Sequence, residues 1–179
     1  MLYFITGNKN KFEEAKTFIP DLEQMDLDLP EIQSLDPHEI IKFKLEEALK
    51  HHQGNFFVED TSFYMKSLND LPGTFSKWFY KVLRPEVIYN VAKQMGDFRA
   101  YAKCLIGYAH NAEDIHFFEG VVEGTIIEPR GEGGFGWDPV FMPAGFDKSF
   151  AEMNRLEKIS ISHRGRALGE FKKFLESTG

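Results

Sequence analysis

The segment from Thr6 to Lys11 reads Thr-Gly-Asn-Lys-Asn-Lys, a composition typical of a phosphate-binding turn. The apolar residues 2–5 before it predict a buried strand and the residues after it predict a helix, so free backbone N–H groups and the helix dipole favour an anion there. Its glycine lets the backbone approach a ligand, and its lysines carry the charge that a polyphosphate needs. Because the full P-loop spacing is lacking, a capped helix start with two solvated lysines is an equal alternative.

Hard oxygen ligands occur in the run Glu59-Asp60-Thr61-Ser62 and, upstream, at Glu31. Mg²⁺ binds nucleotides through one or two carboxylates together with phosphate oxygens. A carboxylate in this run could also orient or deprotonate a water molecule. The alternative is an acidic strand end that faces solvent, which is the commoner role of an isolated Glu-Asp pair.

Three glycines surround two large aromatic residues and an aspartate in Gly133-Gly134-Phe135-Gly136-Trp137-Asp138-Pro139. Aromatic faces stack on heterocyclic bases, glycines let the backbone approach a base, and a carboxylate accepts hydrogen bonds from ring nitrogens. The segment is therefore predicted as a base-binding loop. The competing interpretation is that the aromatic residues fold back under a long loop and fill the core.

Hydrogen-bond donors are gathered at Ser162-His163-Arg164, where the last predicted helix begins. Exposed N–H groups, an imidazole and a guanidinium at one helix start would select carbonyl oxygens of a ligand. Taken alone, a His-Arg pair such as His163-Arg164 usually lies on the protein surface. By default Lys44, Lys77 and Lys158 would also be interpreted as solvated lysines. Covalent catalysis is not favoured, because the single cysteine, Cys104, lies inside a predicted strand and suits a buried structural thiol.

The helix and strand signals place these segments in an α/β arrangement. A strand is predicted at 56–58, directly before the acidic run. Two longer strands at 99–109 and 115–126 are separated by turn residues and predict an antiparallel hairpin, so the sheet is expected to be mixed. Helices are predicted over residues 10–19, 37–52, 75–82, 85–95 and 163–176.

Composition narrows the class of protein. With 179 residues, 42% of them hydrophobic, the chain can bury the core of one domain, predicted to span 1–179. The net charge of -7 disfavours a nucleic-acid binder that neutralises many phosphates, but a local basic pocket for a small phosphorylated ligand stays possible. One cysteine, no secretory signal and no apolar run of the ~20 residues that cross a bilayer predict a cytoplasmic protein with no membrane partner.

Six blocks of the sequence, in this order, strongly resemble the inosine triphosphate pyrophosphatase (Ham1-like) family. The resemblance spans nearly the whole chain, and although each block alone is a weak signal, six in register go far beyond chance agreement. The blocks are Thr6-Gly7-Asn8 with Lys11, Leu29-Pro30-Glu31, Val58-Glu59-Asp60-Thr61-Ser62, Leu71-Pro72-Gly73 with Lys77, Gly134-Phe135-Gly136-Trp137-Asp138-Pro139 and Ser162-His163-Arg164.

This resemblance implies a fold and an activity. The fold would be an elongated mixed β-sheet flanked by helices, with two lobes that enclose a nucleotide cleft, and the protein would be a homodimer. The activity would be Mg²⁺-dependent hydrolysis of the purine nucleoside triphosphates ITP, dITP and XTP to the monophosphate and pyrophosphate, sparing ATP and GTP. Such an enzyme removes deaminated purines from the nucleotide pool and needs no nucleic-acid or membrane partner.

The resemblance also implies roles for individual residues. Asp60 would organise Mg²⁺ and accept the proton of the attacking water, with Glu31 a second metal-linked carboxylate and Glu59 supporting them as a metal ligand. Phe135 would stack on the base, and His163 and Arg164 would read its 6-oxo group. The triphosphate would be held by Thr6, Gly7, Asn8, Lys11, Lys44 and Lys77. The base pocket would consist of Phe135, Gly136, Trp137, Asp138, Lys158, His163 and Arg164, and Thr61 and Ser162 would also bind the substrate.

Two other functions are compatible with parts of the sequence. A related nucleotide pyrophosphatase of the Maf-like type, which divides pyrimidine or modified nucleotides, shares the general architecture, but the Phe-Gly-Trp-Asp and Ser-His-Arg blocks argue against it. A catalytically silent nucleotide-binding or RNA-binding module would keep the pocket for recognition. The intact carboxylates and lysines of this sequence, and its net charge of -7, argue against such a module.

Overall fold

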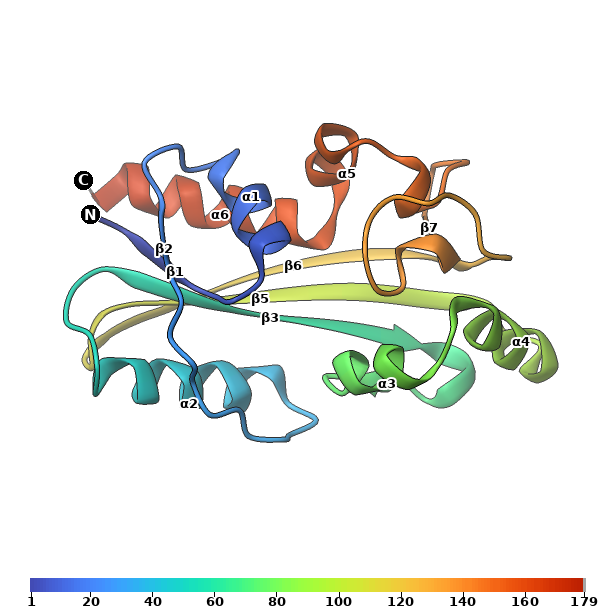
Figure 1. Ribbon diagram of the computed structural model, residues 1–179, viewed down its shortest axis with the longest axis horizontal. Coiled ribbons are helices and arrows are strands. Elements are labelled where there is room, and N and C mark those ends of the chain that lie inside the picture. The colour runs from blue at the N-terminus through green and yellow to red at the C-terminus, as the bar shows by residue number, and fades with distance from the viewer. Residues whose placement is uncertain (179) are drawn as a thin grey trace.

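A mixed sheet of seven strands runs along the length of the computed structural model, which describes residues 1–178 (Figure 1). The strand order is β2-β1-β3-β5-β6-β7, with β4 paired to the end of β3. Strand β1 is parallel to β2 and β3, and the other pairings are antiparallel. The strands are β1 Tyr3–Ile5, β2 Glu23–Met25, β3 Phe56–Met65, β4 Leu71–Gly73, β5 Arg99–Asn111, β6 Asp114–Ile126 and β7 Phe141–Pro143.

Helices cover both faces of the sheet (Figure 1). Helices α1, α5 and α6 lie on one face, α2 and α3 on the other, and α4 lies at the far end. Their bounds are α1 Lys9–Lys16, α2 Pro37–Leu49, α3 Ser76–Val82, α4 Pro85–Met95, α5 Arg155–Ile161 and α6 His163–Thr178. The predicted α/β fold with an elongated mixed sheet is confirmed. None of the helices in residues 1–178 is long and apolar enough to cross a membrane.

Apolar side chains fill the space between sheet and helices in three clusters. Beneath α1 and α6 the rings of Phe4 and Phe57 stack with centroids 4.3 Å apart. On the opposite face Ile41 and Leu45 of α2 pack against β3 and β5. The third cluster surrounds Phe63 at the far end of the sheet. Because apolar burial is the main favourable term in folding, each end of the long sheet has its own source of stability.

Strand β3 is longer than the sequence indicates. Residues 56–58 were the predicted strand, but the strand continues through Glu59-Asp60-Thr61-Ser62 to Met65. The polar character of residues 59–62 predicted that the strand ends there. In the structure each of these residues pairs with a residue of β5. Strands β2, β4 and β7 are each three residues long, too short to leave a periodic signal, and they were not predicted.

A gap in the sheet positions the polar run of β3. On the side of β3 away from β5, strand β1 pairs with Phe56 and Phe57, and β4 pairs with residues 63–65. Between these two partners the described chain supplies no neighbouring strand for residues 58–62 on that side. The acidic residues predicted to do chemistry therefore lie at an open stretch of the sheet edge.

Candidate active site

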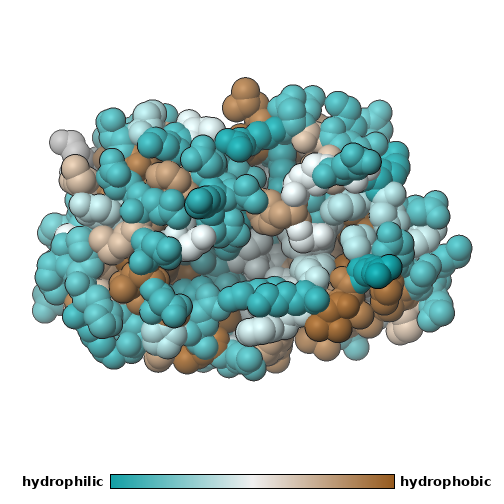
Figure 2. Space-filling model, in the orientation of Figure 1, coloured by the Kyte–Doolittle hydropathy of each residue, from teal (hydrophilic) through white to brown (hydrophobic). Residues whose placement is uncertain are grey.

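A cleft of about 690 Å³ occupies the gap beside β3. Figure 2 shows a hollow near the middle of this face, bordered mostly by hydrophilic residues. The walls come from the turn before α1, the segment between β2 and α2, the polar run of β3, residues 74–81 and the loop at 135–137. Distant stretches of sequence therefore meet at one cavity large enough for a nucleotide.

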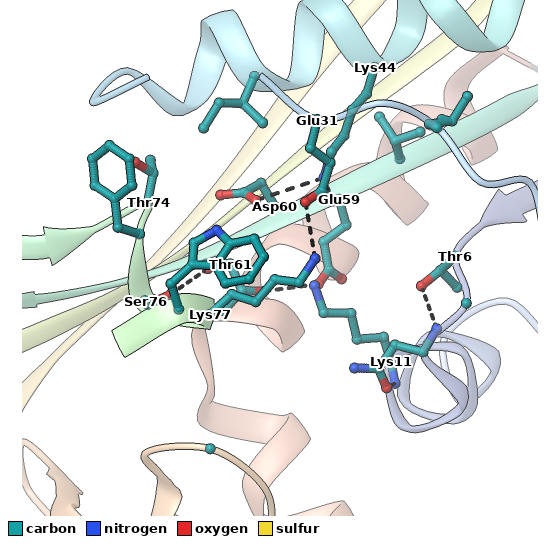
Figure 3. A pocket seen from close by; sticks show the side chains of 18 of the residues that line it. Thr6, Lys11, Glu31, Lys44, Glu59, Asp60, Thr61, Thr74, Ser76 and Lys77 are labelled. Carbon is teal, nitrogen blue, oxygen red and sulfur yellow. Dashed lines mark hydrogen bonds and ion pairs between the residues drawn. The ribbon is translucent and has the colours of Figure 1, made fainter. Parts of the chain in front are cut away.

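The turn between β1 and α1 forms one wall of the cleft. Asn8 Oδ1 accepts hydrogen bonds from the N–H groups of Asn10 and Lys11, at 3.0 and 3.2 Å. Thr6 Oγ1 accepts from the N–H of Asn8 at 3.1 Å (Figure 3). These bonds hold the turn as the capped N-terminus of an eight-residue helix, the local structure that suits a phosphate group.

The ammonium group of Lys44 lies between two carboxylates (Figure 3). Its Nζ is 2.8 Å from Glu31 Oε1 and 3.9 Å from Asp60 Oδ1. Lys77 Nζ lies 3.2 Å from the other oxygen of Glu31. Burial disfavours the charged form of Glu31, but Lys44 and Lys77 outweigh it and lower its pKa to about 2. Glu31 is therefore ionised throughout the neutral range.

The oxygen atoms at this point fit a divalent cation. Glu31 and Asp60 already converge on one positive charge, the ammonium group of Lys44. Within residues 1–178, no three His, Cys, Asp or Glu side chains are grouped so that they could hold a metal ion by themselves. Mg²⁺ requires only one or two carboxylates when phosphate oxygens complete its coordination, so this donor set fits Mg²⁺ together with a polyphosphate.

Glu59, predicted as a supporting metal ligand, has a different environment. Its fully buried carboxylate accepts hydrogen bonds from Arg164 at 2.9 to 3.1 Å and pairs with Lys11 Nζ at 3.0 Å. Thr61 Oγ1 donates to the same carboxylate at 2.9 Å. Burial favours the neutral acid, yet Arg164 and Lys11 hold the pKa of Glu59 well below its usual value. In this structure Glu59 anchors two cations, Lys11 and Arg164, and its role as a supporting metal ligand stays a prediction.

Arg164 continues this contact as a chain of buried ion pairs. Its Nη1 donates to Glu14 Oε2, and Glu14 Oε1 lies 3.8 Å from Lys158 Nζ. Lys158 Nζ is 2.6 Å from Asp138 Oδ2. Burial opposes the charge on Arg164, but Glu59 and Glu14 raise its pKa above the usual value. Burial raises the pKa of Asp138, and Lys158 offsets only part of that effect.

The loop that carries Phe135 closes over this chain. Asp138 Oδ2 accepts from the N–H of Phe135 at 2.7 Å. Gly134 has a φ of +72°, and a Cβ there would lie 2.2 Å from that same oxygen, so the turn requires glycine. The Phe135 ring covers Lys158, with Nζ 4.4 Å from the ring centroid, and Arg164, at 5.6 Å. Phe135 therefore lies between the cleft, which it lines, and the buried cations of Lys158 and Arg164.

Trp137 lies both in the core and at the cleft, the two positions that were considered for the aromatic loop. Its indole stacks on Phe63 with centroids 4.6 Å apart and belongs to the core at the far end of the sheet. Trp137 also lines the cleft, together with Phe135 and Gly136. Core filling and cleft lining therefore occur in the same loop.

His163 is buried without a hydrogen-bond partner on either ring nitrogen. The rings of Trp137 and Phe150 flank it, at 5.3 and 6.2 Å between centroids. Burial, and then the positive charges of Arg164 and Lys158, lower its pKa well below the usual value, so the imidazole is neutral. Because an unpaired buried polar group costs free energy, His163 has unused capacity to hydrogen-bond a ligand. The neighbouring Ser162 Oγ accepts from the N–H of Gly165 at 3.1 Å.

The structure thus divides the predicted residues into two groups. Those that line the cleft are Thr6, Gly7, Asn8, Lys11, Glu31, Lys44, Glu59, Asp60, Thr61, Lys77, Phe135, Gly136 and Trp137. Those buried beyond the cleft wall are Asp138, Lys158, Ser162, His163 and Arg164. The second group contacts the first through Phe135, Glu59, Thr61 and Trp137.

Sequence reasoning missed three residues of this region. Glu14 joins Arg164 to Lys158. The sequence feature that could have indicated this role is its position three residues after Lys11, on the face of α1 that also buries Ala15. Trp78 and Lys81 line the cleft from α3. Lys81 follows the predicted Lys77 by one helical turn, a spacing that places both on one side of a helix.

Comparisons with known proteins agree with this geometry. The sequence model of the Ham1 family matches residues 2–174. The chain is 37% identical over 180 residues to the inosine triphosphate pyrophosphatase of Schizosaccharomyces pombe, covering 98% of this chain and 95% of that protein. The Staphylococcus aureus Ham1 protein is structurally similar with a TM-score of 0.84 and 28% identity, covering 99% of each chain. A HAM1 protein from Coxiella burnetii has a TM-score of 0.86 and 26% identity, covering 99% and 98%.

Proposed function

The chain belongs to the Ham1 family, and on that premise we propose that it hydrolyses ITP, dITP and XTP to the monophosphate and pyrophosphate. One observation carries the proposal: a helix-start phosphate turn and the carboxylates of Glu31 and Asp60, held by lysines, line the same cleft. Phosphate binding, metal binding and water activation all have candidate groups there. The name of the 37% identical yeast relative, inosine triphosphate pyrophosphatase, supports the same activity.

The triphosphate lies against the capped turn at the start of α1. Backbone N–H groups there favour phosphate oxygens. Lys11, Lys44 and Lys77 add positive charge, and each is already held at the cleft by a carboxylate. Because these side chains are held in place before the ligand arrives, less conformational freedom is lost on binding.

Asp60 accepts the proton of the attacking water. One carboxylate oxygen accepts from Ser62 Oγ at 3.1 Å, and the other lies 3.9 Å from Lys44 Nζ. The water oxygen bonds to phosphorus while the bond from that phosphorus to the leaving pyrophosphate oxygen breaks. The water proton passes to Asp60 and then to solvent, so one water is consumed for each monophosphate and pyrophosphate formed.

Glu31 and Asp60 are the residues that would hold Mg²⁺. A bound Mg²⁺ supplies neutralisation of the charge that develops on the phosphate oxygens. Glu31, ionised because Lys44 and Lys77 lower its pKa to about 2, keeps its charge for this role. Lys44 contacts both carboxylates and keeps them close to each other.

The base is selected by the buried donors beyond Phe135. His163 has two ring nitrogens without partners, whereas Arg164 already donates to Glu59, Glu14 and Thr61. His163 is therefore the first candidate to donate to the 6-oxo group. Adenine would meet that donor with its own amino group and leave a buried donor unpaired, at a cost of ~1–3 kcal/mol. Phe135, which lines the cleft and covers Lys158, stacks on the base.

The proposal extends to assembly and location. We infer a homodimer from the family resemblance of the sequence, and a mass near twice the 20.7 kDa of one chain by light scattering is the expected result. The single cysteine supports a place in the reducing cytoplasm.

Pyrophosphate release tests the activity directly. Purified protein is assayed with ITP, XTP, dITP, ATP, GTP and dTTP in the presence of Mg²⁺, with EDTA as a control and with products identified. We expect Mg²⁺-dependent conversion of ITP, dITP and XTP to monophosphates, with ATP and GTP poor substrates. GTP also carries a 6-oxo group, so its rejection tests selection at the purine 2-position.

Other outcomes would redirect the function. Preferential turnover of dTTP would favour the Maf-like activity. No turnover by folded protein that is nevertheless stabilised by ITP would favour a binding module, because a ligand that binds the native state raises its stability without any reaction.

A further inference from the structure

Helix α3 presents two lysines and a tryptophan to the cleft. Lys77, Trp78 and Lys81 all line it, and the two lysines are one helical turn apart. The indole of Trp78 contacts both ammonium groups, with the Nζ atoms of Lys77 and Lys81 at 5.6 and 4.8 Å from the nearest ring centroid. Trp78 is 51% exposed, and Figure 2 shows hydrophobic residues gathered over this part of the molecule.

Lys81 differs from the other lysines of the cleft in its partners. Lys11 pairs with Glu59, and Lys44 and Lys77 pair with Glu31, at 2.8 to 3.2 Å. Lys81 forms no ion pair with any residue from 1 to 178. Five carboxylates line the cleft beside four lysines, so a polyanion enters a space that already holds negative groups. The lysine whose charge is not already neutralised then contributes most to attracting it.

The indole gives Lys81 a defined position. A lysine ammonium ends a flexible four-carbon stem, and ordering that stem costs entropy when a ligand binds. Attraction between the ammonium and the face of Trp78 reduces the number of positions that Lys81 explores. The same ring also lies 5.6 Å from the Nζ of Lys77, so one side chain orders two cations.

We propose that Lys81 is a further binding residue for the polyphosphate chain of the substrate, and that Trp78 is a positioning residue for Lys81 and Lys77. The inference rests on the proposed function for the identity of the ligand, a nucleoside triphosphate. The binding role itself does not depend on that identity, because Lys81 would bind the negative charge of a phosphate chain whether or not a nucleoside is attached. Inorganic tripolyphosphate is therefore the direct probe.

Lys81→Met tests the binding role. Affinity for tripolyphosphate with Mg²⁺ is measured by calorimetry, and KM and kcat are measured with ITP. Loss of one partly solvated charge contact should weaken tripolyphosphate binding and raise KM about fivefold, with a smaller effect on kcat. Lys81→Arg keeps the charge and should stay near wild type.

Lys93 offers a matched control. Its ammonium lies over the ring of Tyr89 at 5.7 Å, on α4 and outside the residues that line the cleft. Lys93→Met removes the same charge from the same kind of aromatic contact and should leave tripolyphosphate affinity and KM unchanged.

Trp78→Leu tests the positioning role. Binding of tripolyphosphate should weaken severalfold, Trp78→Phe should recover much of it, and the effect of Trp78→Leu should be smaller when Lys81→Met is already present. A role in folding alone would lower the melting temperature and leave tripolyphosphate affinity unchanged, which would overturn the assignment of Trp78.

The two proposals fail in different ways. If wild-type protein hydrolyses ITP and folded Lys81→Met matches it in both KM and tripolyphosphate affinity, the role of Lys81 is wrong and the activity stands. If wild-type protein hydrolyses none of the nucleotides but Lys81→Met still weakens tripolyphosphate binding, the activity is wrong and the role of Lys81 stands.

Discussion

Arg164 and Glu59 form a buried ion pair between positions 105 residues apart, with Nε and Nη2 donating to the carboxylate at 2.9 to 3.1 Å. The pair joins the start of α6 to the polar run of β3. Because Glu59 also holds Lys11 at 3.0 Å, the group that fixes the helix to the sheet also positions a lysine of the cleft. Stability and ligand binding therefore depend on the same carboxylate.

Replacing Arg164 should destabilise the fold strongly. Arg164→Met leaves Glu59 with Lys11 and Glu14 with Lys158, but removes the cation between the two buried carboxylates. Removal of one partner of a buried ion pair costs about 3–5 kcal/mol, and urea denaturation at pH 7.5 measures this loss of stability. Lys173→Met, which breaks the exposed pair with Glu170 on the same helix, should change stability by about 0.5 kcal/mol or less. Equal effects of the two changes would contradict a buried role for Arg164.

Asp60→Asn should abolish most of the turnover of ITP. The amide keeps the size of the side chain but cannot accept the water proton, and loss of a general base lowers kcat by about 10²- to 10⁴-fold. Asp21→Asn is the matched control, because Asp21 is exposed and lies outside the residues that line the cleft. The assignment of Asp60 is wrong if the folded Asp60→Asn protein keeps wild-type turnover.

Some of the site could be predicted because its chemistry and its local structure coincide in sequence. A strand, a glycine turn and a capped helix follow one another from Tyr3 to Lys16, so the phosphate turn is readable without any distant contact. The hairpin of β5 and β6 was readable for the same reason, since its turn residues separate two β-rich segments.

The division of labour between Glu59 and Asp60 could not be predicted in this way. Successive side chains of a strand point to opposite faces, so Glu59 with Thr61 and Asp60 with Ser62 form two separate pairs. Which pair meets the cleft lysine Lys44 depends on where α2 and α6 pack. That placement is set by long-range contacts, and no local pattern reports it.

Gly120→Ala should separate α6 from the sheet. A Cβ on Gly120 of β6 would lie 2.0 Å from the carbonyl oxygen of His163 and 2.6 Å from the nitrogen of Ala167, and backbone atoms cannot move aside as a flexible side chain would. Overpacking of this kind costs about 1–3 kcal/mol. Gly169→Ala on α6 meets only Phe18 at 3.9 Å and should stabilise by about 0.5–1 kcal/mol. Thermal unfolding compares the two variants with wild type. A Gly120→Ala protein as stable as wild type would contradict the close packing of α6 on β6.

Protonation of His163 should oppose folding at mildly acidic pH. Burial, with Arg164 and Lys158, lowers its pKa well below 6.5 in the folded protein, so below pH 6.5 the unfolded chain binds a proton that the native state does not. Stability must then fall as pH falls, by about 1.4 kcal/mol between pH 7.5 and 5.5. Glu31 and Glu59 also have lowered pKa values, but their unfolded value of 4.5 places their loss of stabilisation below this window.

The comparison of wild type with His163→Gln isolates this term. Urea unfolding of both proteins at pH 7.5 and 5.5 cancels the contributions of every other titrating group that the two proteins share. Wild type should lose about 1.4 kcal/mol more than His163→Gln over that interval. Equal losses would mean that His163 is protonated in the folded protein as readily as in the unfolded chain. The imidazole would then be charged at mildly acidic pH, which would contradict its assignment as a neutral group that faces the 6-oxo purine.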